Sequence, residues 1–163
     1  MSRPSKVKYY MDVAKQVAAR SHDEETQVGM LLVKEDTGAI VATGYNGFIR
    51  GADDTTLPTK RPDKYEYMLH AEDNIICHCA SHGISMRGCF VVCPISPCAP
   101  CARRLWQCGI SKVIIEKFHP TFEAVKQMKD LKVLVDTFES EGNQYYKLVF
   151  APRRNSIPEL RAD

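Results

Sequence analysis

Hydrophobic side chains near the start of the chain follow first a helical spacing and then a strand-like one. From residue 5 to 20 they recur at i, i+3, i+4 and i+7, which predicts an amphipathic helix with polar residues on its other side. The apolar positions of this helix are Val7, Tyr10, Met11, Ala14, Val17 and Ala18. Two apolar runs, 27–34 and 39–45, then flank the turn Asp36-Thr37-Gly38 and predict a β-hairpin.

Helix-type and strand-type patterns alternate after residue 70. Helical spacing covers 71–82, 98–107 and 120–130, and strand-like runs cover 89–93, 112–116, 131–138 and 144–150. Gly83 is placed to end the first of these helices, and Pro100 falls in the first turn of the second, where proline is tolerated. Strands that alternate with helices predict right-handed crossovers and a parallel half-sheet joined to the N-terminal hairpin. We therefore expect one α/β domain over 1–151, with helices on both faces of a mixed sheet, and a polar tail over 152–163.

A long segment without periodicity, residues 46–67, separates the two halves of the chain. It is rich in Gly, Asp, Pro and Thr. A loop of this length inside a compact domain is usually functional or disordered. This loop also carries basic residues and is long enough to close over a small molecule.

Composition excludes several classes of partner. The chain has 163 residues, of which 44% are hydrophobic and 26% charged, values typical of a globular protein. The net charge of +2 provides no strong field for nucleic acid or a membrane surface, and no apolar run approaches the ~20 residues that span a bilayer. Seven cysteines form an odd count, and the N-terminus lacks an apolar signal segment. We therefore expect a cytoplasmic protein whose cysteines are free thiols or metal ligands.

Two short motifs carry candidate chemistry. Cys98 and Cys101 form a C-x-x-C at the entry to a predicted helix, a pattern that fits structural zinc, a redox pair or coincidence. His70 and Glu72 are two positions apart, and residues at that spacing inside a helix point in different directions. Either the His70–Glu72 pair is a coincidence without function, or a helix begins at this pair and its first turn lets both side chains reach one point.

Taken together, the motifs favour a catalytic metal site. Two β-α units would place both helix N-termini at the same edge of the sheet, where ligands bind. His70, Cys98 and Cys101 would then supply three zinc ligands and leave a fourth position open, while Glu72 would be free to move protons. The order H-x-E followed by P-C-x-x-C is typical of zinc deaminases that act on nucleobases.

Further motifs extend the match. The chain resembles the deoxycytidylate (dCMP) deaminases of the cytidine deaminase superfamily over roughly residues 5 to 130. The matching segments, in the order and spacing of that family, are TQVGM (26–30), GYNGF (44–48), KYEYMLHAE (64–72), SPCAPC (96–101) and CARRLWQCGISKVII (101–115). The resemblance implies the three-layer α/β/α fold of cytidine deaminase, with a sheet of five or six strands.

The resemblance also implies an activity: hydrolysis of dCMP to dUMP with release of ammonia, which supplies dUMP for thymidylate synthesis. One zinc ion per chain, bound by His70, Cys98 and Cys101, would activate water for attack on C4 of cytosine, and Glu72 would shuttle the protons. The Ala71 N–H would bind the cytosine O2, and Asn46 would contact a sugar hydroxyl unless it is an ordinary turn residue. The other substrate-binding residues that we expect are Val28, Tyr67 and Lys64.

Relatives of this kind are regulated by dCTP, which activates, and dTTP, which inhibits. The resemblance therefore implies a nucleoside triphosphate site at Gly47, Phe48 and Arg50, with Mg²⁺ accompanying the triphosphate, and a homo-oligomer, most often a hexamer. Ile49 stands where the family pattern has proline. Phe118-His119 likewise replaces a Tyr-His pair near the substrate phosphate. The basic residues that can bind a phosphate instead are Lys60, Arg61, Lys64 and Arg103.

A second cluster, Cys77, His78, Cys79 and His82, offers further metal-binding side chains. The long loop before His70 has no cysteine or histidine to complete a second zinc site. We therefore expect Cys79 in the core and the two histidines at the surface.

Other functions compete with this interpretation. The first is a deaminase of another cytosine nucleotide, or of RNA or single-stranded DNA like the tRNA adenosine deaminases. Polynucleotides would require a basic groove with aromatic residues, and the near-neutral charge argues against it. The second is a non-catalytic zinc-stabilised binding module. Glu72 argues against that module, because a structural zinc site has no need of an unliganded carboxylate.

Overall fold

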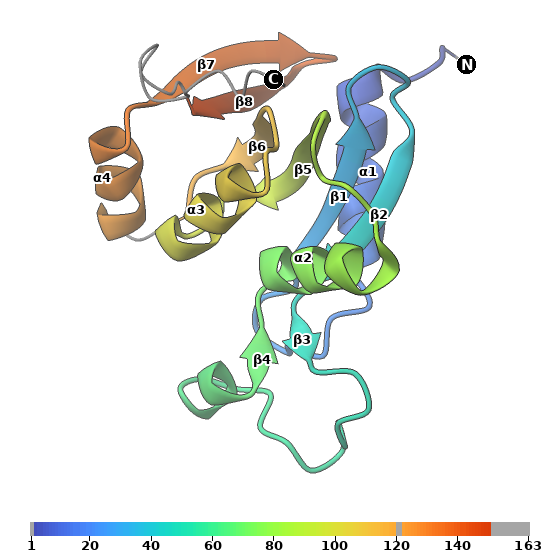
Figure 1. Cartoon of the computed structure of the whole chain (residues 1–163), viewed down its shortest axis with the longest axis vertical. Coiled ribbons are helices and arrows are strands. Elements are labelled where there is room, and N and C mark those ends of the chain that lie inside the picture. Colours follow the sequence, from blue (N-terminus) through green and yellow to red (C-terminus); the bar gives the residue numbers. More distant parts are fainter. Residues whose placement is uncertain (1, 120–121, 151–163) are drawn as a thin grey trace, which may run out of the picture.

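The protein is described by a computed structural model over residues 2–119 and 122–150 (Figure 1). Its helices are α1 (Lys6–Ala18), η1 (Asp63–Glu66), α2 (Ala71–His82), α3 (Ala99–Gln107) and α4 (Phe122–Asp130), of which η1 is a 3₁₀ turn. Its strands are β1 (Gly29–Lys34), β2 (Ile40–Tyr45), β3 (Gly47–Phe48), β4 (Met68–Leu69), β5 (Cys89–Ile95), β6 (Val113–Lys117), β7 (Val133–Ser140) and β8 (Asn143–Phe150). The expected tail over 152–163 lies outside the described residues.

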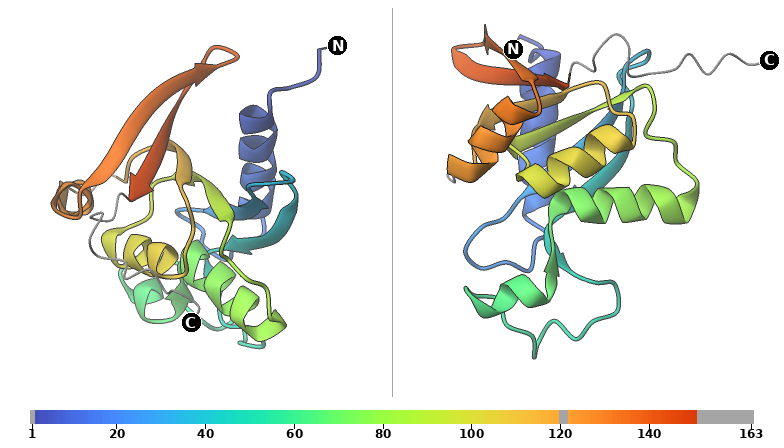
Figure 2. Two further views of the ribbon diagram at one scale, coloured as in Figure 1. Left: turned by 45° about the horizontal axis from the view of Figure 1, so that its top comes forward. Right: turned by 60° about the vertical axis from the view of Figure 1, so that its left-hand side comes forward.

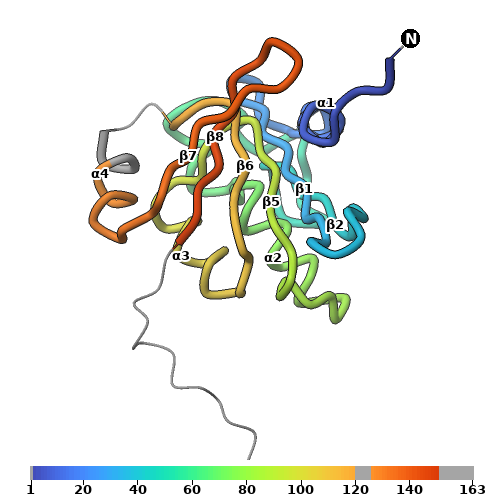
Figure 3. The backbone as a smooth tube through the Cα atoms, turned by 90° about the horizontal axis from the view of Figure 1, so that it is seen from above, coloured from blue at the N-terminus to red at the C-terminus, as the bar shows by residue number. Residues whose placement is uncertain are grey.

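A six-stranded mixed sheet, ordered β2-β1-β5-β6-β8-β7, separates two hydrophobic cores (Figure 3). Side chains of β1 alternate between them, because successive residues of a strand point to opposite faces. Met30 and Leu32 belong to the core under α2 and α3, whereas Leu31 and Val33 pack against α1. The expected three-layer α/β/α fold with helices on both faces is confirmed, with six strands in the sheet.

Helix α1 forms one outer layer and packs closely on the sheet. The Ser5 hydroxyl accepts a hydrogen bond from the Lys8 N–H at 3.2 Å and caps its N-terminus. A Cβ on Gly29 would lie 2.1 Å from the Ala14 carbonyl oxygen, so α1 contacts β1 backbone to backbone. The helical spacing of the sequence directs the apolar face of α1 to the sheet. The absence of a side chain at Gly29 then allows the two backbones to approach this closely.

The expected parallel half-sheet is only partly right. β5 and β6 are parallel, but β8 pairs antiparallel with both β6 and β7. The cause is a tight turn after β7, in which Glu141 and Gly142 both have positive φ, of 51° and 76°, and return the chain directly beside β7. β8 takes the inner position because Tyr145 and Leu148 are buried in the two opposite cores.

The segment before α2 forms a small lobe below the main sheet in Figure 1. β3, inside the loop expected over 46–67, pairs with β4 directly after that loop, and η1 lies between them. This second sheet is inserted between β2 of the main sheet and α2, so the expected β-α unit runs from β2 through the lobe to α2. The helix reaches the main sheet at Gly44, where a Cβ would lie 2.7 Å from the Ala71 carbonyl oxygen.

None of the helices among the described residues has both the length and the apolar character needed to cross a bilayer.

Candidate active site

His70 and Glu72 do converge, because α2 begins between them. His70 is the N-cap residue and has extended backbone angles (φ −69°, ψ 158°), whereas Glu72 is already in the first helical turn. The change of backbone direction at the cap brings both side chains to one cavity. The cap side chain makes no hydrogen bond to its own helix, which leaves its ring nitrogens for another partner.

Helix α3 repeats this arrangement. Cys98 is its N-cap residue, again extended (φ −66°, ψ 161°) and without a capping hydrogen bond. Cys101 follows in the first turn, and Pro100 occupies an early position that needs no N–H partner. The two helices thus place a histidine and two cysteines at adjoining N-termini.

These three side chains have the spacing of a metal site. Nδ1 of His70 lies 3.7 Å from the Cys98 Sγ and 3.5 Å from the Cys101 Sγ, and the ligand atoms all lie within 4.8 Å of one another. Hydrogen bonds from the Cys101 thiol and from His70 hold the pKa of the Cys98 thiol below its usual value, which favours the thiolate form that binds a metal. One imidazole and two thiolates fit zinc in a site with an open fourth position.

Glu72 lies beside these ligands but outside the set. Its side chain is buried, and this burial raises the pKa of its carboxyl to about 7. A carboxyl group with a pKa near the working pH is suited to both accept and return a proton.

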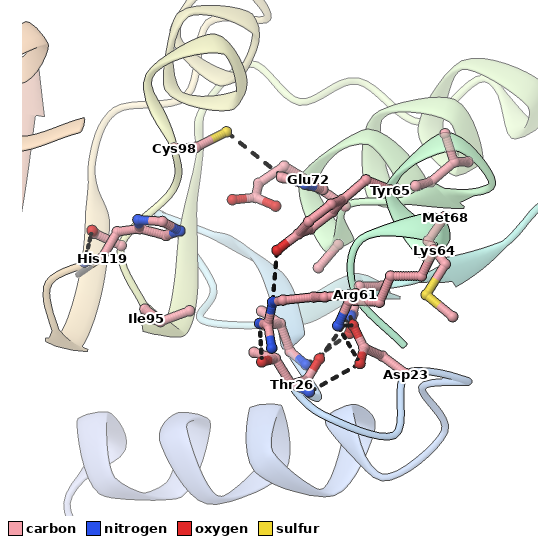
Figure 4. A pocket seen from close by; sticks show the side chains of 16 residues that line it. Asp23, Thr26, Arg61, Lys64, Tyr65, Met68, Glu72, Ile95, Cys98 and His119 are labelled. Carbon is pink, nitrogen blue, oxygen red and sulfur yellow. Dashed lines mark hydrogen bonds and ion pairs between the residues drawn. The ribbon is translucent and has the colours of Figure 1, made fainter. Parts of the chain in front are cut away.

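The cavity at this site has a volume of about 160 Å³ (Figure 4). His70, Ala71, Glu72 and Cys98, from the starts of α2 and α3, line one part of it. The remaining walls come from the loop before β1, the 46–69 lobe and the ends of β5 and β6, through Asp23, Thr26, Val28, Asn46, Arg61, Lys64, Tyr65, Met68, Leu69, Ile95, Ser96 and His119. Of the expected substrate-binding residues, Val28, Asn46, Lys64 and Ala71 therefore face the cavity.

Tyr67 is not among the lining residues. Tyr65 lines the cavity in its place, although both tyrosines are largely exposed, Tyr65 at 59% and Tyr67 at 48%. Tyr67 is the C-cap residue of the 3₁₀ turn η1, whereas Tyr65 lies within that turn, where its hydroxyl accepts a hydrogen bond from Arg61.

Lys64 faces the cavity with its charge already compensated. Its Nζ lies 2.7 Å from both carboxylate oxygens of Asp23 and 3.1 Å from Glu25, and the residue is 2% exposed. This ammonium group ties the lobe to the loop before β1. Sequence reasoning missed Asp23, because a charge pair 41 residues apart has no local signal.

Arg61 is the more available cation of the cavity. Its Nε donates to the Tyr65 hydroxyl at 2.6 Å and its Nη2 donates to the Thr26 hydroxyl at 2.8 Å, as Figure 4 shows, and Glu25 lies 3.4 Å from Nη1. Neither Lys60 nor Arg103 lines the cavity.

Asn46 holds the wall of the cavity together. Its Oδ1 accepts from the Val28 N–H at 2.8 Å, and its Nδ2 donates to the Thr26 carbonyl at 2.8 Å and to Asp23 at 3.2 Å. The side chain thus fixes the loop before β1 while it faces the cavity.

A second cavity of about 380 Å³ is lined by residues of β2, β3 and α2 and of the segment that follows β3. Phe48 and Arg50, two of the expected regulatory residues, line it together with His22 and Asn74. Gly47 does not line it. A Cβ at this glycine would lie 2.5 Å from the His22 Nδ1, so the position requires glycine for packing.

The cysteine–histidine cluster at the end of α2 forms no second metal site among the described residues. Cys79 is 2% exposed in the core, as expected. The rings of His78 and His82 stack on each other at 4.3 Å, with His82 exposed and His78 half-buried.

Comparison with known proteins agrees with this geometry. Residues 4–117 match the model of the cytidine and deoxycytidylate deaminase zinc-binding region. The chain is 34% identical to a deoxycytidylate deaminase of Mus musculus over 149 residues, covering 86% of this chain and 82% of that protein. It is 37% identical to the Homo sapiens deoxycytidylate deaminase over 124 residues, covering 71% and 68%. The crystal structure of a dCMP deaminase from the cyanophage S-TIM5, in complex with dCMP and dUMP, superposes with a TM-score of 0.64 at 26% identity, covering 80% of this chain and 94% of that one.

We predict that the protein contains about one tightly held zinc ion per chain. Cys98→Ser or Cys101→Ser removes one of only three protein ligands, so each variant is expected to lose the metal. Metal analysis of the purified proteins measures this. Zinc retained by a variant with both substitutions would contradict the ligand assignment, and two ions per chain would point to a further site.

Proposed function

Because the chain belongs to the cytidine and deoxycytidylate deaminase family, we propose that it converts dCMP and water to dUMP and ammonia. The observation that carries this proposal is the buried Glu72 carboxyl, which lines one cavity with His70 and Cys98. The ligand atoms of these two residues lie within 4.8 Å of the Cys101 sulfur. A non-catalytic zinc module would gain nothing from this carboxyl, whose burial opposes its ionisation.

The reaction replaces the 4-amino group of cytosine with oxygen. His70, Cys98 and Cys101 would hold the zinc ion, which would supply Lewis-acid activation of water. Glu72 accepts one proton of the attacking water and delivers it to N3 of the ring, and later transfers the proton of the new C4 hydroxyl to the departing amino group. The C4–O bond forms, the C4–N bond breaks, and ammonia leaves. The pKa of about 7 suits Glu72 to both transfers.

Backbone and side-chain groups that line the cavity are suited to orient the base and the sugar. Ala71 is the first residue of α2, so its N–H has no acceptor within the helix and can donate to the cytosine O2. Asn46 and Val28 lie on the adjoining wall. We assign the sugar hydroxyl to Asn46, whose amide position is held by three hydrogen bonds.

We assign the 5′-phosphate to Arg61 in preference to Lys64. The Lys64 ammonium is enclosed by Asp23 and Glu25, whereas the side chain of Arg61 is 46% exposed and two of its three polar contacts are neutral hydroxyl groups. A guanidinium group also matches the planar, two-point geometry of a phosphate.

We predict that kcat/KM for dCMP exceeds that for deoxycytidine by at least about tenfold, because a charged hydrogen bond contributes ~1.5–3 kcal/mol. Arg61→Gln is expected to reduce the value for dCMP and leave that for deoxycytidine unchanged. Ammonia release from a panel of cytosine nucleosides and nucleotides measures the substrate preference and the effect of the substitution.

Lys60→Gln is the matched control, since this neighbouring cation lies outside the cavity and is 71% exposed. Equal values for the two substrates would contradict phosphate selectivity, and faster turnover of RNA or single-stranded DNA would support the polynucleotide alternative.

We predict that Glu72→Ala retains the fold and zinc but loses at least ~10²–10⁴ in turnover, because it removes the proton carrier. Glu72→Gln keeps the shape of this buried side chain and is expected to be equally inactive. Metal analysis and circular dichroism establish that both variants are loaded and folded. Near-normal activity in a zinc-loaded variant would exclude Glu72 from catalysis.

We further propose that dCTP activates and dTTP inhibits this enzyme, with Mg²⁺ bound to the triphosphate. The second cavity supports a regulatory site because it lies apart from the zinc ligands and includes Phe48 and Arg50. In steady-state kinetics, each nucleotide is expected to change the dCMP concentration that gives the half-maximal rate. Arg50→Gln is expected to reduce the size of this change. Kinetics that respond to neither nucleotide would contradict this regulation.

Finally, we propose that the enzyme is a cytoplasmic homo-oligomer, with a hexamer as the expected form, and that residues 1–151 form its single domain. Leu134 and Val135 support self-association, because they expose apolar surface on the edge strand β7.

A further inference from the structure

A two-point ion pair joins the two helices that carry the metal-binding residues. Asp73 lies in the first turn of α2 and Arg104 lies on α3, three residues after Cys101. The Arg104 Nε donates to Oδ1 of Asp73 at 2.7 Å, and its Nη2 donates to Oδ2 at 2.8 Å. Among the residues that the structure describes, this is the one ion pair between α2 and α3.

The same guanidinium group contacts a metal-binding sulfur. The Arg104 Nη2 lies 3.6 Å from the Cys101 Sγ as a donor. Cys101 is 1% exposed, so water does not compete for its sulfur, and the guanidinium reaches it from the open side of α3. A charged N–H donor stabilises the thiolate form that binds a metal, and such outer contacts orient the ligand.

The two-point hydrogen bonding between Asp73 and Arg104 orients the guanidinium group toward the Cys101 sulfur. Asp73 accepts from Nε and Nη2 at once, which fixes the guanidinium plane and leaves the Nη2 group directed at sulfur. A lysine at the same position would present a single rotatable ammonium group and would lack this constraint.

We propose that Asp73 and Arg104 are a positioning pair for the zinc centre. Arg104 donates to the Cys101 sulfur, Asp73 holds the guanidinium in place, and the pair sets the distance between the N-termini of α2 and α3. This inference rests on the zinc binding of the proposed function. It does not depend on the identity of the substrate.

The test is zinc affinity, measured by competition with a chelator on the folded protein. Arg104→Leu and Asp73→Asn are each expected to lower the affinity ~10–100-fold, the usual effect of removing an outer-shell partner. The double variant is expected to be no weaker than Arg104→Leu, because the two residues act as a unit. Arg103→Leu is the matched control, since it removes the adjacent charge from an exposed position outside the cavity, and is expected to leave the affinity unchanged.

A spectroscopic measurement separates positioning from simple helix stabilisation. In the Co²⁺-loaded protein, loss of the N–H donor is expected to move the thiolate-to-cobalt charge-transfer band to longer wavelength in Arg104→Leu and not in Arg103→Leu. Arg104→Lys is expected to give an intermediate zinc affinity. A purely structural pair would lower the denaturation midpoint while zinc affinity and the band stay unchanged, and that result would overturn the proposal.

Neither measurement uses a substrate, so failure of the two proposals can be distinguished. A protein that releases no ammonia from dCMP would refute the proposed reaction and leave the zinc measurements to decide the role of the pair. A wild-type protein that binds no zinc would overturn the positioning role together with the ligand assignment.

Discussion

The site depends on two helices that begin at the same place. His70 and Cys98 are both N-cap residues with extended backbones, and neither side chain caps its own helix. The positive ends of both helix dipoles therefore meet at the three ligands, where they favour thiolates and the negative charge that develops on a substrate. Ala71, the first residue of α2, lines the cavity, and its N–H has no acceptor within the helix.

Contacts with the surrounding structure hold the N-termini of α2 and α3 in place. Gly44 lets α2 approach β2 at the Ala71 carbonyl, and α3 follows β5 in the centre of the sheet. The Asp23–Lys64 pair attaches the 46–69 lobe to the loop before β1. Burial opposes ionisation of Asp23, but hydrogen bonds from Lys64 and from two backbone N–H groups outweigh it and lower its pKa. Removing one partner of such a pair leaves an uncompensated buried charge, a loss of about 3–5 kcal/mol, so the lobe is firmly anchored.

This anchoring also explains where the sequence interpretation was incomplete. Apolar runs identified every strand of the main sheet. β1 and β5 are buried on both faces, so each reads as a continuous apolar run. The pairing of β8 between β6 and β7 followed from a two-residue turn, so an antiparallel strand interrupts the parallel half-sheet expected from alternation. The 46–67 segment has no period because its order comes from a pair of two-residue strands and from charges of the distant loop before β1.

The sequence alone was enough to identify the candidate metal ligands and the candidate proton carrier. His70, Glu72, Cys98 and Cys101 lie at helix starts, and the spacing of a helix start is a local property that short motifs record. Only the tertiary structure decided the roles of the charged residues around them. It paired Lys64 with Asp23, left Arg61 facing the cavity, and joined Arg104 to Asp73 across 31 positions. The physical reason is that an ion pair requires two charges to meet in space, and charges that are distant along the chain have no periodic pattern to reveal their partner.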